Sequence, residues 1–354
     1  MPRYVDAVLA EAAVESARLG HPAVETVFIG GGTPSLLPER MMGQLLSGLR
    51  DQFDMTRYVE WTCEANPGTL TERWLRTAVE GGVNRLSLGM QACQPELLRT
   101  LGRIHDFDQV VASVDMARRA GIGNLNLDLM FGLPGQSPSM WLETLDKALS
   151  LDTEHLSCYG LIPEEDTPLK ADLDAGRLSL PSDDEERRMY DNALTVLASH
   201  GYEQYEISNF ARPGYACRHN LGYWRQVPYI GLGASAASCL PEDAECAYSR
   251  LANPAGIGDY LAMVEQCDWD KRTRERISPA EACFETMMLG LRTTQGVSEA
   301  TFEAMHGVTL RSCYGDRLDV LMKRGLVDCQ NGWYRLTRRG MDVQNAVLVE
   351  LMDE

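Results

Sequence analysis

Four short segments of this 354-residue chain place polar groups directly after runs of apolar residues. They are Gly30–Thr33 (GGGT), Glu64 in EANP, Gln91 in LSLGMQ and Asp128 in NLDLMFGLPGQ. Glycines let a ligand approach the backbone and expose N–H donors to a carboxylate. A carboxylate can accept from an α-ammonium group, and a further one can hold ribose hydroxyls. Together the four segments predict a site for an amino acid joined to a nucleoside.

Each of these groups has a simpler interpretation when it is taken alone. A run of three glycines usually forms a tight turn, and a single carboxylate or amide can cap a helix or hold a loop. The glycine run is not a P-loop, because no Gly-Lys-Ser/Thr follows it. The prediction therefore depends on four polar strand ends in sequence, each followed by a helix.

The segment CRHNLGYW, residues 217–224, is a second candidate site. A histidine such as His219 beside aromatic residues is usually a hydrogen-bonded structural residue. An imidazole next to Tyr and Trp rings can also ligate heme iron while the rings cover the porphyrin. In a competing interpretation, Cys217 supplies the ligand as a thiolate and the histidine caps a turn. We expect Tyr223 and Trp224 to serve in packing.

Short β-branched runs alternate with longer helical patterns, which is typical of βα units. The predicted strands are Val24–Ile29, Tyr58–Glu64, Arg85–Leu88, Asn124–Met130, His155–Leu161 and Glu203–Ile207. The predicted helices are Tyr4–Leu19, Pro38–Arg50, Leu70–Gly81, Asp106–Ala120 and Ser139–Ser150. Gly81 and Gly121 stand where a glycine commonly ends a helix. Regular βα repetition favours a parallel barrel with its chemistry at the C-terminal ends of the strands. A doubly wound open sheet has the same periodicity.

The pattern changes after residue 250. Glu281–Leu291 and Leu310–Arg324 have helical periodicity, and a last helix begins at about Arg338. Between them, LVDC and WYRLT flank Asn331–Gly332, which predicts a two-stranded hairpin. Helix, hairpin and helix resemble a winged-helix module, but no basic stripe marks a recognition face. A packing or lid domain is the favoured interpretation.

Composition narrows the classes of partner. The net charge is −18, and an acidic body repels phosphate backbones, so nucleic acid is not an expected partner. The ten cysteines have scattered spacings, which favours reduced thiols and a cytoplasmic location. No apolar run reaches the roughly 18 residues of a membrane span, so no integral membrane segment is expected.

Seven motifs occur in order along the chain: GGGTPSLL, EANPGTL, RLSLGMQ, LGR-x-H, NLDLMFGLPGQ, HNLGYW and LGLRTTQGV. They resemble radical S-adenosylmethionine (SAM) proteins of the oxygen-independent coproporphyrinogen III oxidase family, and HNLGYW is similar to the heme-chaperone branch of that family. The resemblance implies an α/β fold, with a partial (β/α)6 TIM-type barrel over residues 1–240. It also implies a small C-terminal domain of the HemN type, helical and winged-helix-like, over residues 241–354.

The same resemblance implies functional residues. The expected SAM contacts are Gly31, Gly32, Thr33, Glu64, Gln91, Arg103 and Asp128, and the expected heme contact is His219. The implied function is a chaperone that binds heme and SAM and delivers heme to receiving proteins. One alternative is an oxygen-independent coproporphyrinogen III oxidase, which decarboxylates its substrate oxidatively with SAM. Another is a degenerate binding module that has lost both ligands.

The chain departs from the family at its iron–sulfur site. Such proteins hold a 4Fe–4S cluster with C-x3-C-x2-C before the first strand, whereas the first cysteine here is Cys63 and no trio has that spacing. No 4Fe–4S site is therefore expected in this chain, and SAM binding is expected to be weak. Cys93 and Cys158, like Cys63, are expected to be small buried hydrophobic residues.

The first predicted helix, Tyr4–Leu19, has no strand before it. In a βα architecture a leading helix usually belongs to a unit whose strand came first. That missing unit is also where the family carries its cluster loop, so we expect Met1 to be an internal or misassigned start. The strand Val24–Ile29 would then present an unpaired edge.

Overall fold

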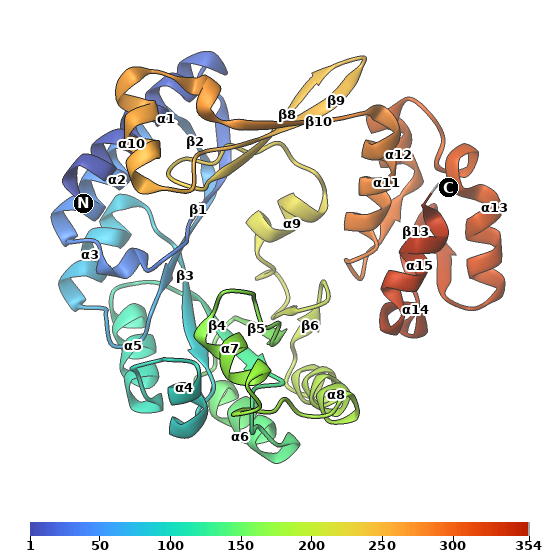
Figure 1. The fold of residues 1–354 in the computed structure, drawn as a ribbon, viewed down its shortest axis with the longest axis horizontal. Coiled ribbons are helices and arrows are strands. Elements are labelled where there is room, and N and C mark those ends of the chain that lie inside the picture. The colour runs from blue at the N-terminus through green and yellow to red at the C-terminus, as the bar shows by residue number, and fades with distance from the viewer. Residues whose placement is uncertain (353–354) are drawn as a thin grey trace.

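The computed structural model describes residues 1–352, and a curled seven-stranded sheet forms its centre (Figure 1). The spatial order is β1-β2-β3-β4-β5-β7-β6. The strands are β1 (Ala23–Ile29), β2 (Asp54–Ala65), β3 (Arg85–Gln91), β4 (Asn124–Phe131), β5 (His155–Gly160), β6 (Glu203–Gln204) and β7 (Asn209–Ala211). β1 to β5 are parallel, whereas β7 pairs antiparallel with β5 and β6. The sheet is a half-barrel, and the sixth predicted unit is replaced by this antiparallel pair.

Helices cover the outer face of the half-barrel (Figure 1). They are α1 (Pro2–Arg18), α2 (Glu39–Gln52), α3 (Glu72–Gly81), α4 (Pro95–Thr100), α5 (Phe107–Arg119), α6 (Pro138–Leu149) and α8 (Asp183–Ser199), whereas the short α7 (Pro168–Asp174) buries no residue. Their ends follow local chemistry, since Asp106 and Gln109 form a reciprocal capping box at the start of α5. The left-handed residue that ends α3 is Gly82, with φ 111°, and not the predicted Gly81. Gly121 takes this role after α5, as predicted.

The two faces of the sheet differ in polarity because successive side chains of a strand point to opposite sides. On β2 and β3, Trp61, Cys63, Leu86 and Leu88 are buried in the main apolar cluster. Their alternate neighbours are polar and face the concave lumen. Burying an apolar side chain of this size contributes about 1.5–3 kcal/mol. The outer face therefore holds the fold together, and the inner face is available for ligands.

A second, three-stranded sheet follows the half-barrel, and the sequence patterns did not predict it. Its order is β10-β9-β8, and it comprises β8 (Ala237–Asp243), β9 (Cys246–Ala252) and β10 (Thr273–Ile277), with α10 (Ile257–Gln266) inserted. Buried Glu11 on α1 accepts hydrogen bonds from the Tyr260 hydroxyl and the Gly233 N–H, both at 2.7–2.8 Å, and pairs with Arg272 at 2.7 Å. The leading helix is thus tied into this later part of the chain.

The C-terminal domain packs around its own apolar cluster, which runs from Cys283 to Leu351. Its elements are α11 (Pro279–Gly290), β11 (Val297–Ser298), α12 (Glu299–His306), α13 (Leu310–Lys323), β12 (Val327–Gln330), β13 (Trp333–Leu336), α14 (Arg338–Asp342) and α15 (Gln344–Leu351). The predicted hairpin is confirmed, with φ values of 53° at Asn331 and 78° at Gly332. The boundary predicted between residues 240 and 241 stays a prediction, and β8 crosses it.

Within residues 1–352, no helix combines the length and the apolar character that crossing a membrane requires.

Candidate functional site

The glycine loop after β1 leaves open space above its backbone. Gly31 and Gly32 have φ values of 82° and 57°, which are unfavourable for other residues, and a Cβ at either position would meet no atom within 4 Å. The Gly31 N–H donates a hydrogen bond of 3.1 Å to Glu64 Oε2 at the end of β2. At Gly30, a Cβ would lie 3.1 Å from the same carboxylate. Two of the predicted groups, the loop and the glutamate, are therefore in direct contact.

Asn66 connects two other predicted residues. Its amide nitrogen lies 3.2 Å from Thr33 Oγ1, and its amide oxygen accepts from Arg103 Nη1 at 3.4 Å. The Asn66 N–H also donates to Ser35 Oγ at 3.3 Å. This residue was not predicted as part of the site, although it belongs to the EANP motif. The structure thus gathers Thr33, Arg103 and the loop after β2 at the same end of the half-barrel.

Gln91 occupies an irregular end of β3. Its φ of 64° lies in the left-handed region, which costs a non-glycine residue about 1–2 kcal/mol. The register against β4 shifts between Leu88 and Gln91. A Cβ at Gly89 would lie 3.0 Å from Gln91 Nε2 and 3.5 Å from Asn66 Oδ1. The absence of a side chain at Gly89 therefore leaves room for the amides of Gln91 and Asn66. Backbone strain such as that of Gln91 concentrates at ligand sites.

Asp128 lies on the inner face of β4 and is partly exposed. Its carboxylate accepts hydrogen bonds from Ser87 Oγ at 3.0 Å and from Asn126 Nδ2 at 2.8 Å. Removal from water raises the pKa of Asp128, and these hydrogen bonds oppose the effect. Burial also raises the pKa of Glu64, and the charge of Asp128 raises it further. Two carboxylates that resist ionisation next to each other form a site that favours a bound cation.

His219 lies on α9 (Arg218–Trp224), a short helix on the concave side of the sheet (Figure 1). Glu60 of β2 caps this helix, because its carboxylate accepts the N–H groups of Arg218 and His219 at 3.1 and 3.0 Å. The imidazole stacks on Phe28 with 5.1 Å between ring centroids. The glutamate is buried and was not predicted from the sequence. Its only signal was a polar residue at an inward-facing strand position.

Both ring nitrogens of His219 are hydrogen-bonded within the chain. Nδ1 lies 2.9 Å from Thr26 Oγ1 on β1, and Nε2 lies 3.0 Å from the Tyr223 hydroxyl. Burial lowers the pKa of His219, so the ring favours its neutral form. A metal ligand must be neutral, but one of these two hydrogen bonds must open first. The Tyr223 side is the accessible one, because that ring is exposed at the surface.

The other residues of this segment have structural roles. Cys217 is fully buried, and burial raises the pKa of its thiol to about 11, which disfavours the thiolate of the competing interpretation. The half-buried Trp224 carries the guanidinium of Arg292 over its ring at 5.7 Å. α9 also lies against β1, which pairs only with β2 within residues 1–352.

The described residues do not fit a 4Fe–4S cluster. Cys63 and Cys158 are buried, and burial raises the pKa of Cys63 to about 12. Cluster ligands must be thiolates. Among residues 1–352, no group of three or more His, Cys, Asp or Glu side chains could hold a metal ion. Cys93 is likewise buried as a free thiol, so all three cysteines match the predicted structural role.

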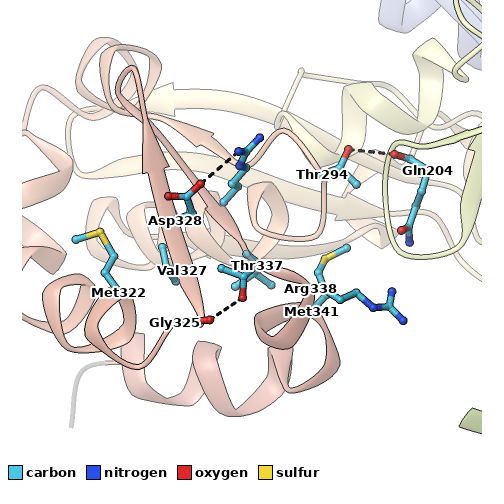
Figure 2. A pocket seen from close by; sticks show the side chains of 11 residues that line it. Gln204, Thr294, Met322, Gly325, Val327, Asp328, Thr337, Arg338 and Met341 are labelled. Carbon is cyan, nitrogen blue, oxygen red and sulfur yellow. Dashed lines mark hydrogen bonds and ion pairs between the residues drawn. The ribbon is translucent and has the colours of Figure 1, made fainter. Parts of the chain in front are cut away.

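A pocket of about 620 Å³ lies away from these residues, between β6 and the C-terminal domain (Figure 2). Its polar groups are engaged with one another. Asp328 pairs with Arg335 at 3.3 Å, and the Thr337 hydroxyl donates to the Gly325 carbonyl at 2.8 Å. The Arg338 guanidinium at its edge pairs with Asp191 at 2.7 Å. This pocket lacks the paired carboxylates and the open backbone loop of the half-barrel.

The half-barrel and the C-terminal domain are each similar to a known protein family. Residues 1–148 match the Radical SAM superfamily, and residues 277–343 match the HemN C-terminal domain. In solved structures, the fold resembles coproporphyrinogen III oxidase (HemN) from Escherichia coli, a radical SAM enzyme. The TM-score is 0.82 at 21% sequence identity, and the match covers 98% of this chain and 82% of that chain.

Curated relatives define the family more closely. The heme chaperone HemW of Bacillus subtilis is 36% identical, over 99% of this chain and 91% of the relative. The heme chaperone HemW of Escherichia coli is 34% identical, over 92% of this chain and 83% of the relative. With this similarity over almost the whole chain, and with the half-barrel and C-terminal domain described above, the chain belongs to the HemW family of radical SAM proteins.

Proposed function

We propose that this protein is a heme chaperone, which binds heme on the concave side of the half-barrel and delivers it to receiving proteins. The observation that carries the proposal is the position of His219. Its imidazole is partly exposed, stacks on Phe28 and is hydrogen-bonded to the Tyr223 hydroxyl, and burial lowers its pKa. Similarity to curated heme chaperones over nearly the full length supports the same function. A cytoplasmic location stays a prediction.

SAM is the second proposed ligand, at the C-terminal ends of the strands. The contacts would come from Gly31, Gly32, Thr33, Glu64, Gln91, Arg103 and Asp128. The two carboxylates suit the ammonium and hydroxyl groups of this ligand, and the guanidinium suits its carboxylate. Because the described residues do not fit an iron–sulfur cluster, a metal chelate does not contribute. We expect calorimetry to give a dissociation constant of about 1 mM, near −4 kcal/mol, and micromolar binding would contradict this.

The test of heme binding is a titration of the full chain with hemin, followed by the Soret band. His219→Ala should weaken or shift the band, since it removes the ligand nitrogen. Cys217→Ala should leave the band in place, and His200→Ala, at an exposed surface histidine, is the matched control. An unchanged spectrum in His219→Ala together with a changed one in Cys217→Ala would reverse the assignment. Delivery is measured as heme transfer from the loaded protein to apomyoglobin.

Tyr223→Phe tests whether the tyrosine hydroxyl controls access to the histidine. The substitution removes the partner of Nε2 and leaves the ring in place, so heme binding should become several-fold tighter. Thr26→Val, on the other side of the imidazole, should instead weaken binding, because it releases the ring from β1. If both variants weaken binding equally, the hydroxyl contacts the cargo itself.

Coproporphyrinogen III oxidase activity is the second candidate function. The fold likeness to the Escherichia coli enzyme favours it. The described residues count against it, because that chemistry needs a cluster and no group of three or more His, Cys, Asp or Glu side chains among residues 1–352 could hold a metal ion. Incubation with coproporphyrinogen III, SAM and a reductant should leave the substrate unchanged, and formation of the decarboxylated product would favour the enzyme.

A further inference from the structure

Arg85 is a buried arginine with an unsatisfied polar atom. It begins β3, and only 2% of its surface is exposed. It shares the inner face of the strand with Ser87, because the alternate residue Leu86 belongs to the outer core. Within residues 1–352 it forms no ion pair, and its Nε has no hydrogen-bond partner. A guanidinium removed from water without a partner costs several kcal/mol, so such groups are rarely left unsatisfied.

The two residues in register with Arg85 on the neighbouring strands share this property. Thr62 on β2 and Asn124 on β4 are its Cα partners in the sheet. The Thr62 hydroxyl and the Asn124 amide oxygen are buried and also lack partners. We call these three residues the lumen floor. Arg85 and Asn124 begin β3 and β4, and Thr62, in register with them, lies two residues before Glu64 on β2. Three adjacent unsatisfied side chains mark a place where another molecule is held.

The nearby acidic side chains form no ion pair with the Arg85 guanidinium of the lumen floor. The Asp128 carboxylate is occupied by Ser87 and Asn126, although Arg85 is near enough to oppose the rise in its pKa. Glu60, on the same face of β2 as the floor threonine, is engaged with the backbone of α9. The floor therefore offers a positive charge with two hydrogen-bond donors, the guanidinium and a hydroxyl.

We propose that the lumen floor is a binding site for a carboxylate of the cargo. The Arg85 fork accepts one carboxylate in bidentate geometry, and the Thr62 hydroxyl donates a further hydrogen bond. The Asn124 amide supplies a donor when it is rotated by half a turn, since its oxygen and nitrogen exchange places without changing its shape. This inference rests on the proposed function: when the cargo is heme, the carboxylate is one of its propionates.

Proximity to α9 supports this connection. Burial lowers the pKa of His219, and the positive charge of Arg85 lowers it further, so the guanidinium acts on the proposed iron ligand through space. A cargo held by both groups would have its charged edge on the floor and its metal at the helix. The competing occupant is water, which can satisfy all three side chains without any charge.

The first experiment compares hemin with hemin dimethyl ester, in which both propionates are esterified. The wild-type chain should bind hemin at least about tenfold more tightly than the ester, which corresponds to about 1.4 kcal/mol. Arg85→Gln should bind both ligands equally. Arg76→Gln, an exposed arginine on the outer helix α3, is the matched control and should keep the wild-type preference. A full preference in Arg85→Gln would overturn the proposal.

The second experiment does not depend on heme. Sodium propionate should raise the unfolding temperature of the wild type in a saturable manner, compared with sodium chloride at equal ionic strength. Arg85→Gln should lose this rise, and Thr62→Val, which removes the hydroxyl without changing the shape, should reduce it. Thr62→Val keeps the test decisive when Arg85→Gln does not fold.

The two experiments separate this inference from the proposed function. If propionate stabilises the wild type but hemin does not bind, the floor is a carboxylate site and the heme function fails. If hemin binds without preference over its ester and propionate has no effect, the heme function stands. The floor is then filled by water, and the inference fails.

Discussion

The lumen of the half-barrel and the core of the C-terminal domain are built from similar helices and strands but contain opposite side chains. Glu64, Arg85 and Asp128 face the lumen, whereas the buried positions of the C-terminal domain are taken by residues such as Phe302 and Leu318. Burying a charge costs several kcal/mol, while burying a large apolar side chain contributes about 1.5–3 kcal/mol. The polar side chains of the lumen therefore lower the stability of the fold but can bind ligands. The apolar side chains of the C-terminal domain stabilise the fold by packing.

The largest expected effect is on the apolar side of this comparison. Phe302→Ala should lower the free energy of unfolding by about 3–5 kcal/mol, because the ring is fully buried in the C-terminal cluster. Met305→Ala, at an exposed position of the same helix, should change it by less than about 0.5 kcal/mol. Urea unfolding measures both. If Phe302→Ala loses less than about 1 kcal/mol of unfolding free energy, the surrounding side chains have moved to fill the space that the ring leaves.

The reverse effect is expected in the lumen. Arg85→Met should raise the free energy of unfolding of the ligand-free chain by about 1–4 kcal/mol, the range by which apolar replacements of buried ion pairs can stabilise a protein. Urea unfolding in carboxylate-free buffer measures it, with Arg76→Met as the exposed control. Destabilisation by Arg85→Met would show that the guanidinium has a partner and that the lumen does not oppose stability.

Glu60 differs from the other lumen carboxylates, because it holds the backbone of α9 and therefore contributes to stability. Glu60→Gln should cost about 1–2 kcal/mol, since the neutral amide accepts the N–H groups of Arg218 and His219 less strongly. Amide exchange at those two residues should become faster. Glu25→Gln removes the exposed ion pair of the same helix and should cost less than about 1 kcal/mol. If both variants lose the same free energy of unfolding, the exposed ion pair holds α9 in place as strongly as Glu60 does.

The smallest effect is the pH dependence of the ligand-free chain. Burial raises the pKa of Glu64 above 4.5, its ordinary value, so the folded chain holds a proton that the unfolded chain releases. The contribution of this group to stability should therefore fall as the pH rises from 4.5 through the folded pKa.

Glu64→Gln should remove this slope, and Glu80→Gln, at an exposed position of α3, should keep it. Unfolding temperatures measured across this pH range decide the point. A slope that survives in Glu64→Gln would assign the proton to another carboxyl whose pKa is raised by burial, namely Asp128, Glu206 or Glu186.

Much of the half-barrel could be predicted because its signals are local. Apolar runs placed β1 to β5 to within a few residues, and Asn331–Gly332 specified its hairpin turn through two positive φ values. The motif order also identified the family, as the relatives confirm. By contrast, the sheet β8–β10 was missed, because β8 and β9 contain no β-branched residue and the outer strands β8 and β10 are largely exposed.

The candidate site was predictable in its parts but not in its contacts. The types and order of Gly31, Glu64 and Asp128 were sufficient to place a ligand site at the strand ends, since parallel strands bring those ends together. Only the tertiary structure decided that Glu60 caps α9 and that His219 has both ring nitrogens engaged. It also decided that the Arg85 Nε is left without a hydrogen-bond partner, since such pairing depends on side chains far apart in sequence. The sequence determined which groups the lumen contains, and long-range packing determined which of them remain free to bind.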